Sequence, residues 1–218
     1  MSSSSPRRVA LLAAAGALSV TSLVAVGSAA EAATCSDVDV VFARGSGELP
    51  GLGITGTPFV QAVTSAAAGR SVSSYAVNYP ADWSQTTAPQ GATDAVNHIR
   101  TVAAQCPGTR FVLGGYSQGG TVVDIAIGLP TFGGSGSTVP AELASRVAAV
   151  VTFGNPANKY NQHITTSATY GKKAKEFCNS GDLVCDPLGA NVFAHILYGF
   201  DGSTTKAGQF AASLVTAG

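Results

Sequence analysis

The 218-residue sequence has no excess of charge of either sign, because 12 Lys and Arg balance 12 Asp and Glu. A basic face that would bind nucleic acid is therefore not indicated. The sequence also contains no C-x-x-C pair to suggest zinc, and no internal repeat, heptad or interdomain linker. These absences favour one ordinary globular domain with neither nucleic acid nor metal bound.

The first 32 residues have the composition of a secretory signal peptide. Arg7 and Arg8 precede an apolar stretch, and an A-x-A pattern follows at Ala30 to Ala32. The twin-arginine route and the general secretory route both fit. Cleavage would leave residues 33–218, enough for one domain, with ten basic and eleven acidic residues. We expect an extracellular monomer, in the medium or at the cell envelope, without a stable membrane anchor.

All four cysteines lie in the mature part of the chain. An even number in an exported protein favours two disulfides, although three connectivities are open. Locality favours Cys178 with Cys185, which leaves Cys35 for Cys106.

Most apolar runs are continuous, as in strands that are buried on both faces of a parallel sheet. We expect strands at 38–43, 71–77, 110–115, 146–153 and 174–177. Helices are expected at about 57–68, 90–105, 118–128 and 205–216. This alternation predicts an α/β domain with an open, parallel, five-stranded sheet flanked by helices.

The stretch GGYSQGG, residues 114–120, contains a G-x-S-x-G motif where a strand meets a helix. That context is the one in which a nucleophilic serine stands on a sharp, strained turn, with neighbours that must lack side chains. A plain Gly-Ser turn is the alternative. We predict that Ser117 is a nucleophile.

A serine hydroxyl needs a base, and in this kind of fold the acid and then the histidine follow the serine along the chain. Only His163 and His195 follow Ser117. His195 is the better candidate, because it lies in an apolar segment beyond the last strand, whereas His163 lies in a polar loop. A buried structural histidine is the alternative. His98 lies on the polar side of a helix pattern, where we expect it to be solvated.

Asp182 is the best candidate for the acid that orients this base. It follows the last strand and lies between Cys178 and Cys185, where a disulfide would hold a loop carboxylate in place. Asp186 is the rival, although the adjacent Pro187 suits a turn. The other acids between Ser117 and His195 are Asp124, Glu142 and Glu176.

Acyl transfer also needs donors for the developing oxyanion. The backbone N–H of Gln118 is one. A second is expected from the glycine-rich loop 43–53, which has neither the lysine of a P-loop nor the order G-x-G-x-x-G.

Four stretches together resemble the cutinase family of small secreted serine esterases: CSDVDVVFARGSGE, GGYSQGG, CNSGDLVC and AHILYG. The resemblance extends from Cys35 to about Phe200. The stretch YAVNYPADW, residues 75–83, is similar to the actinobacterial cutinase-like branch, which acts on lipids and short-chain esters rather than strictly on cutin.

The resemblance implies a single-domain α/β-hydrolase with Ser117, Asp182 and His195 as its catalytic set. It adds the Ser46 hydroxyl as an oxyanion donor beside Gln118. It also implies the disulfides Cys35–Cys106 and Cys178–Cys185, and neither a cofactor nor a metal.

The substrate is expected to be an ester of short to medium chain length, small or polymeric, including cutin or lipids. Leu188, Val192 and Phe193 lie just before His195, where they could accept the acyl chain or, alternatively, pack in the core. No insertion is long enough for a helical lid. Two other functions stay open: an acetyl-xylan-type carbohydrate esterase, and a silent exported protein that binds lipids or a surface.

Overall fold

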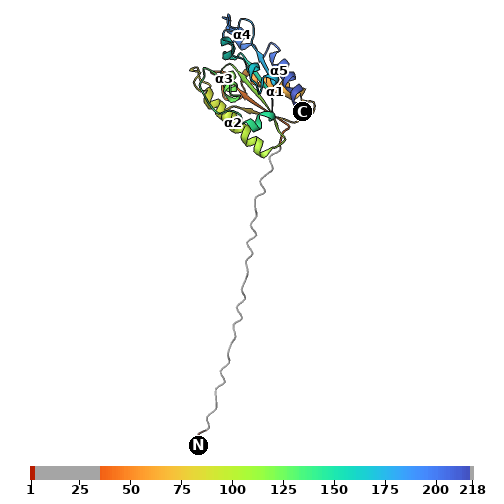
Figure 1. The fold of residues 1–218 in the computed structure, drawn as a ribbon. Helices are drawn as coiled ribbons and strands as arrows, with labels where there is room; N and C mark the ends of the chain where they lie inside the picture. Colours follow the sequence, from red (N-terminus) through yellow and green to blue (C-terminus); the bar gives the residue numbers. More distant parts are fainter. Residues whose placement is uncertain (3–34, 217–218) are drawn as a thin grey trace. The chain divides into compact units, whose positions relative to one another are not determined.

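In the computed structural model the described residues are 1–2 and 35–216, so almost all of the predicted signal peptide lies outside them. The chain divides into the units Met1–Ala32 and Ala33–Gly218. The second unit contains the helices and strands of the structure (Figure 1).

The centre of this unit is a five-stranded sheet in the order β2-β1-β3-β4-β5, with every neighbouring pair parallel. The strands are β1 Val38–Ala43, β2 Val72–Ala76, β3 Arg110–Tyr116, β4 Val147–Phe153 and β5 Ala174–Phe177. All five expected strands are confirmed, with ends that differ by one residue at most. β1, β3 and β4 are buried on both faces, which explains their continuous apolar sequences.

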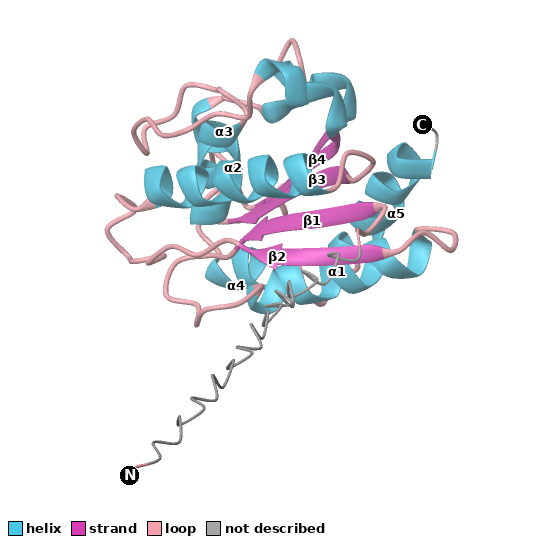
Figure 2. Ribbon diagram, turned by 90° about the horizontal axis from the view of Figure 1, so that it is seen from below, coloured by secondary structure: helices cyan, strands magenta, loops and turns pink. Residues whose placement is uncertain are grey.

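Helices cover both faces of the sheet. The α-helices are α1 Gly53–Ala66, α2 Ala88–Gln105, α3 Gln118–Ala126, α4 Val192–Ile196 and α5 Ser203–Thr216. The 3₁₀ helices are Ala141–Arg146, Pro156–Tyr160, Ile164–Thr166 and Gly171–Lys173. α2 and α3 lie on one face, and α1 and α5 on the other (Figure 2). No helix in the described ranges is both long and apolar enough to cross a bilayer.

The helices differ from the expected ones most at α1 and α4, and other ends differ by two residues at most. α1 begins at Gly53, four residues early, where the Glu48 carboxylate accepts the Ile54 N–H at 2.7 Å. It ends at Ala66 because positive φ angles at Ala68 and Gly69 turn the chain. The five-residue α4 was not expected, because so short a helix leaves no periodic pattern to detect.

The expectation that His98 is solvated was wrong. Its ring stacks on Tyr75 with centroids 3.7 Å apart, and its Nε2 lies 2.6 Å from Oδ2 of the buried Asp39. His98 thus faces a buried carboxylate at the start of β1. The polar side of a helix pattern could not indicate this contact.

Asp124, on α3, is a second buried carboxylate and is only 1% exposed. Its Oδ1 accepts a hydrogen bond from the Asn155 side chain at 2.9 Å, whereas Oδ2 has no hydrogen-bond partner among the described residues. Burial raises the pKa of Asp124 to about 7, despite the opposing hydrogen bond from Asn155.

This shift predicts a stability that falls as the pH rises. The folded protein holds the Asp124 proton up to about pH 7, whereas the unfolded chain releases it near pH 4. Asp124→Asn should therefore gain stability relative to the wild type between pH 5 and pH 8, by a few kcal/mol. Urea unfolding at several pH values measures this difference.

Asp37→Asn is the matched control for this measurement. Hydrogen bonds from Ser71 lower the pKa of the Asp37 carboxyl, so its contribution is lost only as the pH falls toward acid values. The difference between Asp37→Asn and the wild type should be constant from pH 5 to pH 8. A similarly constant difference for Asp124→Asn would contradict the prediction.

Candidate active site

Ser117 stands between β3 and α3 in a strained backbone conformation, with φ of +54° and ψ of −121°. A Cβ at Gly115 would lie 2.1 Å from the Gly119 carbonyl oxygen, and one at Gly119 would lie 2.0 Å from the Ala43 carbonyl oxygen. Both flanking residues must therefore be glycine for α3 to pack against β3 and β1. The turn leaves the Ser117 hydroxyl at the carboxyl end of the sheet.

His195 reaches this serine from α4. Its Nε2 lies 2.9 Å from Ser117 Oγ, and its ring is stacked 5.0 Å from that of Tyr116. The Tyr116 hydroxyl donates to the His195 carbonyl at 3.1 Å. Gly154 passes so close that a Cβ there would lie 2.7 Å from the imidazole Cε1. The imidazole is thus fixed by packing on both sides.

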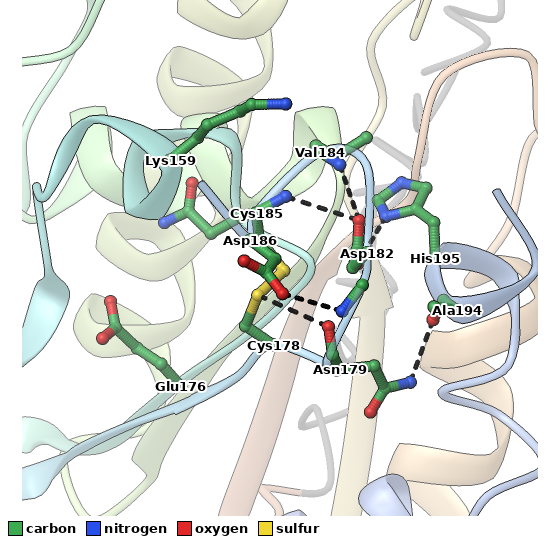
Figure 3. The surroundings of a disulfide bond; sticks show 12 residues. Lys159, Glu176, Cys178, Asn179, Asp182, Val184, Cys185, Asp186, Ala194 and His195 are labelled. Carbon is green, nitrogen blue, oxygen red and sulfur yellow. Dashed lines mark hydrogen bonds and ion pairs between the residues drawn. A yellow bond between two sulfur atoms is a disulfide. The ribbon is translucent and has the colours of Figure 1, made fainter. Parts of the chain in front are cut away.

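Asp182 completes the hydrogen-bonded chain. Its Oδ2 lies 2.9 Å from His195 Nδ1, and its side chain is buried. Asp182 belongs to the loop between Cys178 and Cys185, whose disulfide is formed as expected, as is the one between Cys35 and Cys106. Figure 3 shows the carboxylate of this loop facing His195.

Several donors stabilise the ionised form of Asp182. Its Oδ1 accepts the Val184 N–H at 2.7 Å, and its Oδ2 accepts the Tyr198 hydroxyl at 2.5 Å. Burial alone would raise the pKa of the Asp182 carboxyl, but the hydrogen bonds from His195, Tyr198 and the amide outweigh it and lower that pKa. A negative charge is therefore held beside His195.

Ser46 and Gln118, the two expected oxyanion donors, lie together. The Ser46 hydroxyl donates to Gln118 Oε1 at 3.2 Å and accepts the amide of Gln85 at 2.6 Å. Because Gln85 donates to the oxygen, the one proton of Ser46 points to Gln118 Oε1 and has to turn away from it to reach another acceptor. The backbone N–H of Gln118 begins α3, where the first amides of a helix lack intrahelical partners.

The loop that carries Ser46 is held by its own side chains. Arg44 is buried and donates to the Glu48 carbonyl at 2.9 Å and to the Tyr79 carbonyl at 2.7 Å. The Glu48 carboxylate accepts the Gly45 N–H at 2.6 Å. These bonds fix the loop after β1 before any substrate arrives.

Leu188, Val192 and Phe193 are exposed, by 94%, 51% and 65%. Core packing, the alternative expected for them, is therefore wrong. Leu188 follows the loop that carries Asp182, and Val192 and Phe193 are the first two residues of α4, which carries His195.

The rival residues lie elsewhere in the structure. Asp186 accepts the amides of Gly181 and Leu188 within the turn, at 2.7 and 3.0 Å. His163 lies beside Glu176, with Nδ1 and Oε2 3.0 Å apart. Within the described ranges, no three His, Cys, Asp or Glu residues are grouped so that they could hold a metal ion.

Two residues of the site were not predicted from the sequence: Gln85, which contacts Ser46, and Tyr198, which contacts Asp182. Gln85 has a positive φ of 63° without being glycine, and no motif marked it. Tyr198 follows His195 by three residues in AHILYG, a spacing that places side chains together on a helical turn. That spacing was the available signal for Tyr198.

The sequence matches the Cutinase family model over residues 34–215. The chain belongs to the cutinase family. A cutinase of Kineococcus radiotolerans is 56% identical over 188 residues, which are 85% of this chain and 64% of that relative's length. The carboxylesterase Culp1 of Mycobacterium tuberculosis is 42% identical over 204 residues, 90% of this chain and 89% of the relative.

A solved acetyl xylan esterase has the same fold, with a TM-score of 0.71 and 26% identity over 84% of this chain and 100% of that one. The cutinase family consists of serine ester hydrolases, so the expected α/β-hydrolase fold and enzyme class are both confirmed.

Proposed function

We propose that this chain is an exported carboxylic ester hydrolase that acts through an acyl-enzyme on Ser117. The observation that carries the proposal is the continuous set of hydrogen bonds from Ser117 through His195 to Asp182. The relatives named cutinase and carboxylesterase support the same class of reaction. The two disulfides and the predicted signal peptide support export.

In the first half of the reaction, Ser117 Oγ attacks the ester carbonyl carbon while His195 Nε2 accepts its proton. Asp182 holds His195 in the correct tautomer and stabilises the imidazolium that forms. The carbonyl oxygen becomes an oxyanion, for which Gln118 N–H and the Ser46 hydroxyl are the donors. To reach it, Ser46 turns its proton away from Gln118 Oε1.

The tetrahedral intermediate then collapses. The bond to the alcohol oxygen breaks, and that oxygen takes the proton from His195 as it leaves. Water repeats the sequence on the acyl-enzyme: His195 accepts a proton from water, the hydroxide oxygen bonds to the carbonyl carbon, and the proton returns to Ser117 as the acid departs. His195 and Ser117 end the cycle as they began it.

We expect kcat/KM for p-nitrophenyl esters to be greatest at about C4 to C8. Each methylene contributes roughly 0.8 kcal/mol only while it is removed from water, and the exposed side chains of Leu188, Val192 and Phe193 offer a shallow surface. Between α3 and α5 no described helix is longer than six residues, so we expect no cover that an interface would open. Assays from acetate to palmitate, below and above the solubility limit, test both points.

These assays also test the proposed function itself. An optimum at palmitate, or a sharp rise in rate at the solubility limit, would contradict the shallow open site. No turnover of any ester would contradict the hydrolase assignment. The likeness to acetyl xylan esterase makes a carbohydrate esterase the second candidate; activity on acetylated xylan with none on butyrate would favour it.

A further inference from the structure

Tyr198 contacts the same carboxylate oxygen as His195. Its hydroxyl donates to Asp182 Oδ2 at 2.5 Å, and the His195 Nδ1 lies 2.9 Å from that oxygen. The tyrosine hydroxyl in turn accepts the Asn179 N–H at 2.9 Å. Tyr198 is therefore bonded to both the backbone and the acid of the Cys178–Cys185 loop.

The Tyr198 ring has no freedom to move away from this position. It is fully buried, with its centroid 5.9 Å from that of Phe153 and 6.1 Å from that of Tyr116. The hydroxyl also lies 3.4 Å from the disulfide sulfur of Cys185, a weak acceptor, so its proton is directed to the much closer and charged Asp182 Oδ2.

We propose that Tyr198 is a positioning residue, which acts through Asp182 by fixing the oxygen that orients His195. The proposal rests on the proposed function. On the other side of the carboxylate, Oδ1 is held by the backbone N–H groups of Val184 and Cys185, at 2.7 and 3.4 Å. With both oxygens held, the carboxylate cannot rotate without losing a bond, so the tautomer and direction of the imidazole are fixed before substrate binds.

Tyr198 also affects how strongly the Asp182 carboxylate stabilises the protonated form of His195. Burial and the nearby carboxylate raise the pKa of the Tyr198 phenol, so it remains a neutral donor. A neutral donor takes up part of the negative charge of Asp182 and weakens its hold on the imidazolium. Without that donor, the imidazolium should be more stable and His195 should titrate at a higher pH.

Tyr198→Phe removes only the hydroxyl and keeps the packed ring. We expect kcat for p-nitrophenyl butyrate to fall about 10- to 100-fold with KM nearly unchanged, as for loss of a hydrogen bond to a charged group. The midpoint of the His195 titration, followed by NMR of the imidazole, should rise by roughly 0.5 pH unit. The three histidines can be told apart with His195→Gln.

Tyr116→Phe is the matched control. Tyr116 is buried in the same cluster, but its hydroxyl donates to the His195 carbonyl and not to Asp182. Both variants should lower the melting temperature, and only Tyr198→Phe should move the titration midpoint. Both variants keep the charged groups of this region, which are Asp186 beside Asp182, Lys159 near Asp186, and Glu48 near Tyr116.

The titration needs no ester, so it separates this proposal from the proposed function. Loss of melting temperature without a shift of the midpoint, or an equal shift in Tyr116→Phe, would reduce Tyr198 to a structural role and overturn the proposal. Should Tyr198→Phe fail to fold, 3-fluorotyrosine at position 198 replaces it. This more acidic phenol donates more strongly and should lower the midpoint; an unchanged midpoint would equally overturn the proposal.

Discussion

Ser117→Ala is expected to lower kcat for p-nitrophenyl butyrate by about 10⁶-fold, with KM little changed. The alanine removes the atom that forms the acyl-enzyme, and His195 is then left without a proton to accept. Because the turn at Ser117 is imposed by Gly115, Gly119 and the strand, the smaller side chain should not change the fold. Initial rates and the melting temperature, measured on the same preparation, check both statements.

Asp182→Asn should lower kcat by about 10⁴-fold. An amide keeps the shape of the carboxylate, but it no longer stabilises the imidazolium and it favours the wrong tautomer of His195. Asp186→Asn is the control, because Asp186 bonds to backbone amides of its turn rather than to His195. If both aspartate variants lost activity equally, Asp182 would not be the orienting acid.

Covalent labelling by a fluorophosphonate distinguishes the loss of the nucleophile from the loss of its activation. Wild type should be labelled rapidly, Asp182→Asn slowly, and Ser117→Ala not at all. Ser180→Ala, which changes an exposed serine of the Cys178–Cys185 loop, should be labelled like the wild type. Labelling of Ser117→Ala at the wild-type rate would show that another residue is the nucleophile.

The sheet could be predicted from the sequence because its strands have one strong physical signature. Strands that are buried on both faces are mostly apolar, and so are β1, β3 and β4 apart from Asp39, Arg110 and Thr152. Once the strands are known to be parallel, their carboxyl ends share one edge of the sheet. Residues that follow β1, β3 and β5, such as Ser46, Ser117 and Asp182, then become neighbours without any knowledge of loop conformation.

The residues that support the site could not be predicted so well, because loop conformation decides their contacts. Gln85 reaches Ser46 only because the loop before α2 adopts left-handed backbone at Ala81 and Gln85. No local pattern indicates the bond from the Tyr198 hydroxyl to Asp182, which lies 16 positions away in a disulfide loop. His98 was predicted to be solvated because it lies on the polar side of a helix pattern, but that position faces the buried Asp39.

Ser46→Ala is expected to lower kcat by roughly 10² to 10³, with little change in KM. The ground-state carbonyl is a weak acceptor, whereas the oxyanion of the intermediate is a strong one, so a donor at this position acts chiefly on the transition state. Ser46 is suited to this role because Gln85 donates to its oxygen, and its one proton, which Gln118 Oε1 accepts at 3.2 Å, can turn to the oxyanion.

Gln118→Ala should cost less in kcat than Ser46→Ala, because the donor at position 118 is the backbone N–H, which the substitution keeps. The Gln118 side chain is fully buried and accepts a hydrogen bond from the Ser46 hydroxyl. Its loss should therefore lower the melting temperature and leave the Ser46 side chain less firmly held. Steady-state kinetics with p-nitrophenyl butyrate, together with thermal unfolding of both variants, separate the two effects. Equal and small losses of kcat would count against the Ser46 hydroxyl as a donor, and a change confined to KM would mean that it binds the substrate without stabilising the oxyanion.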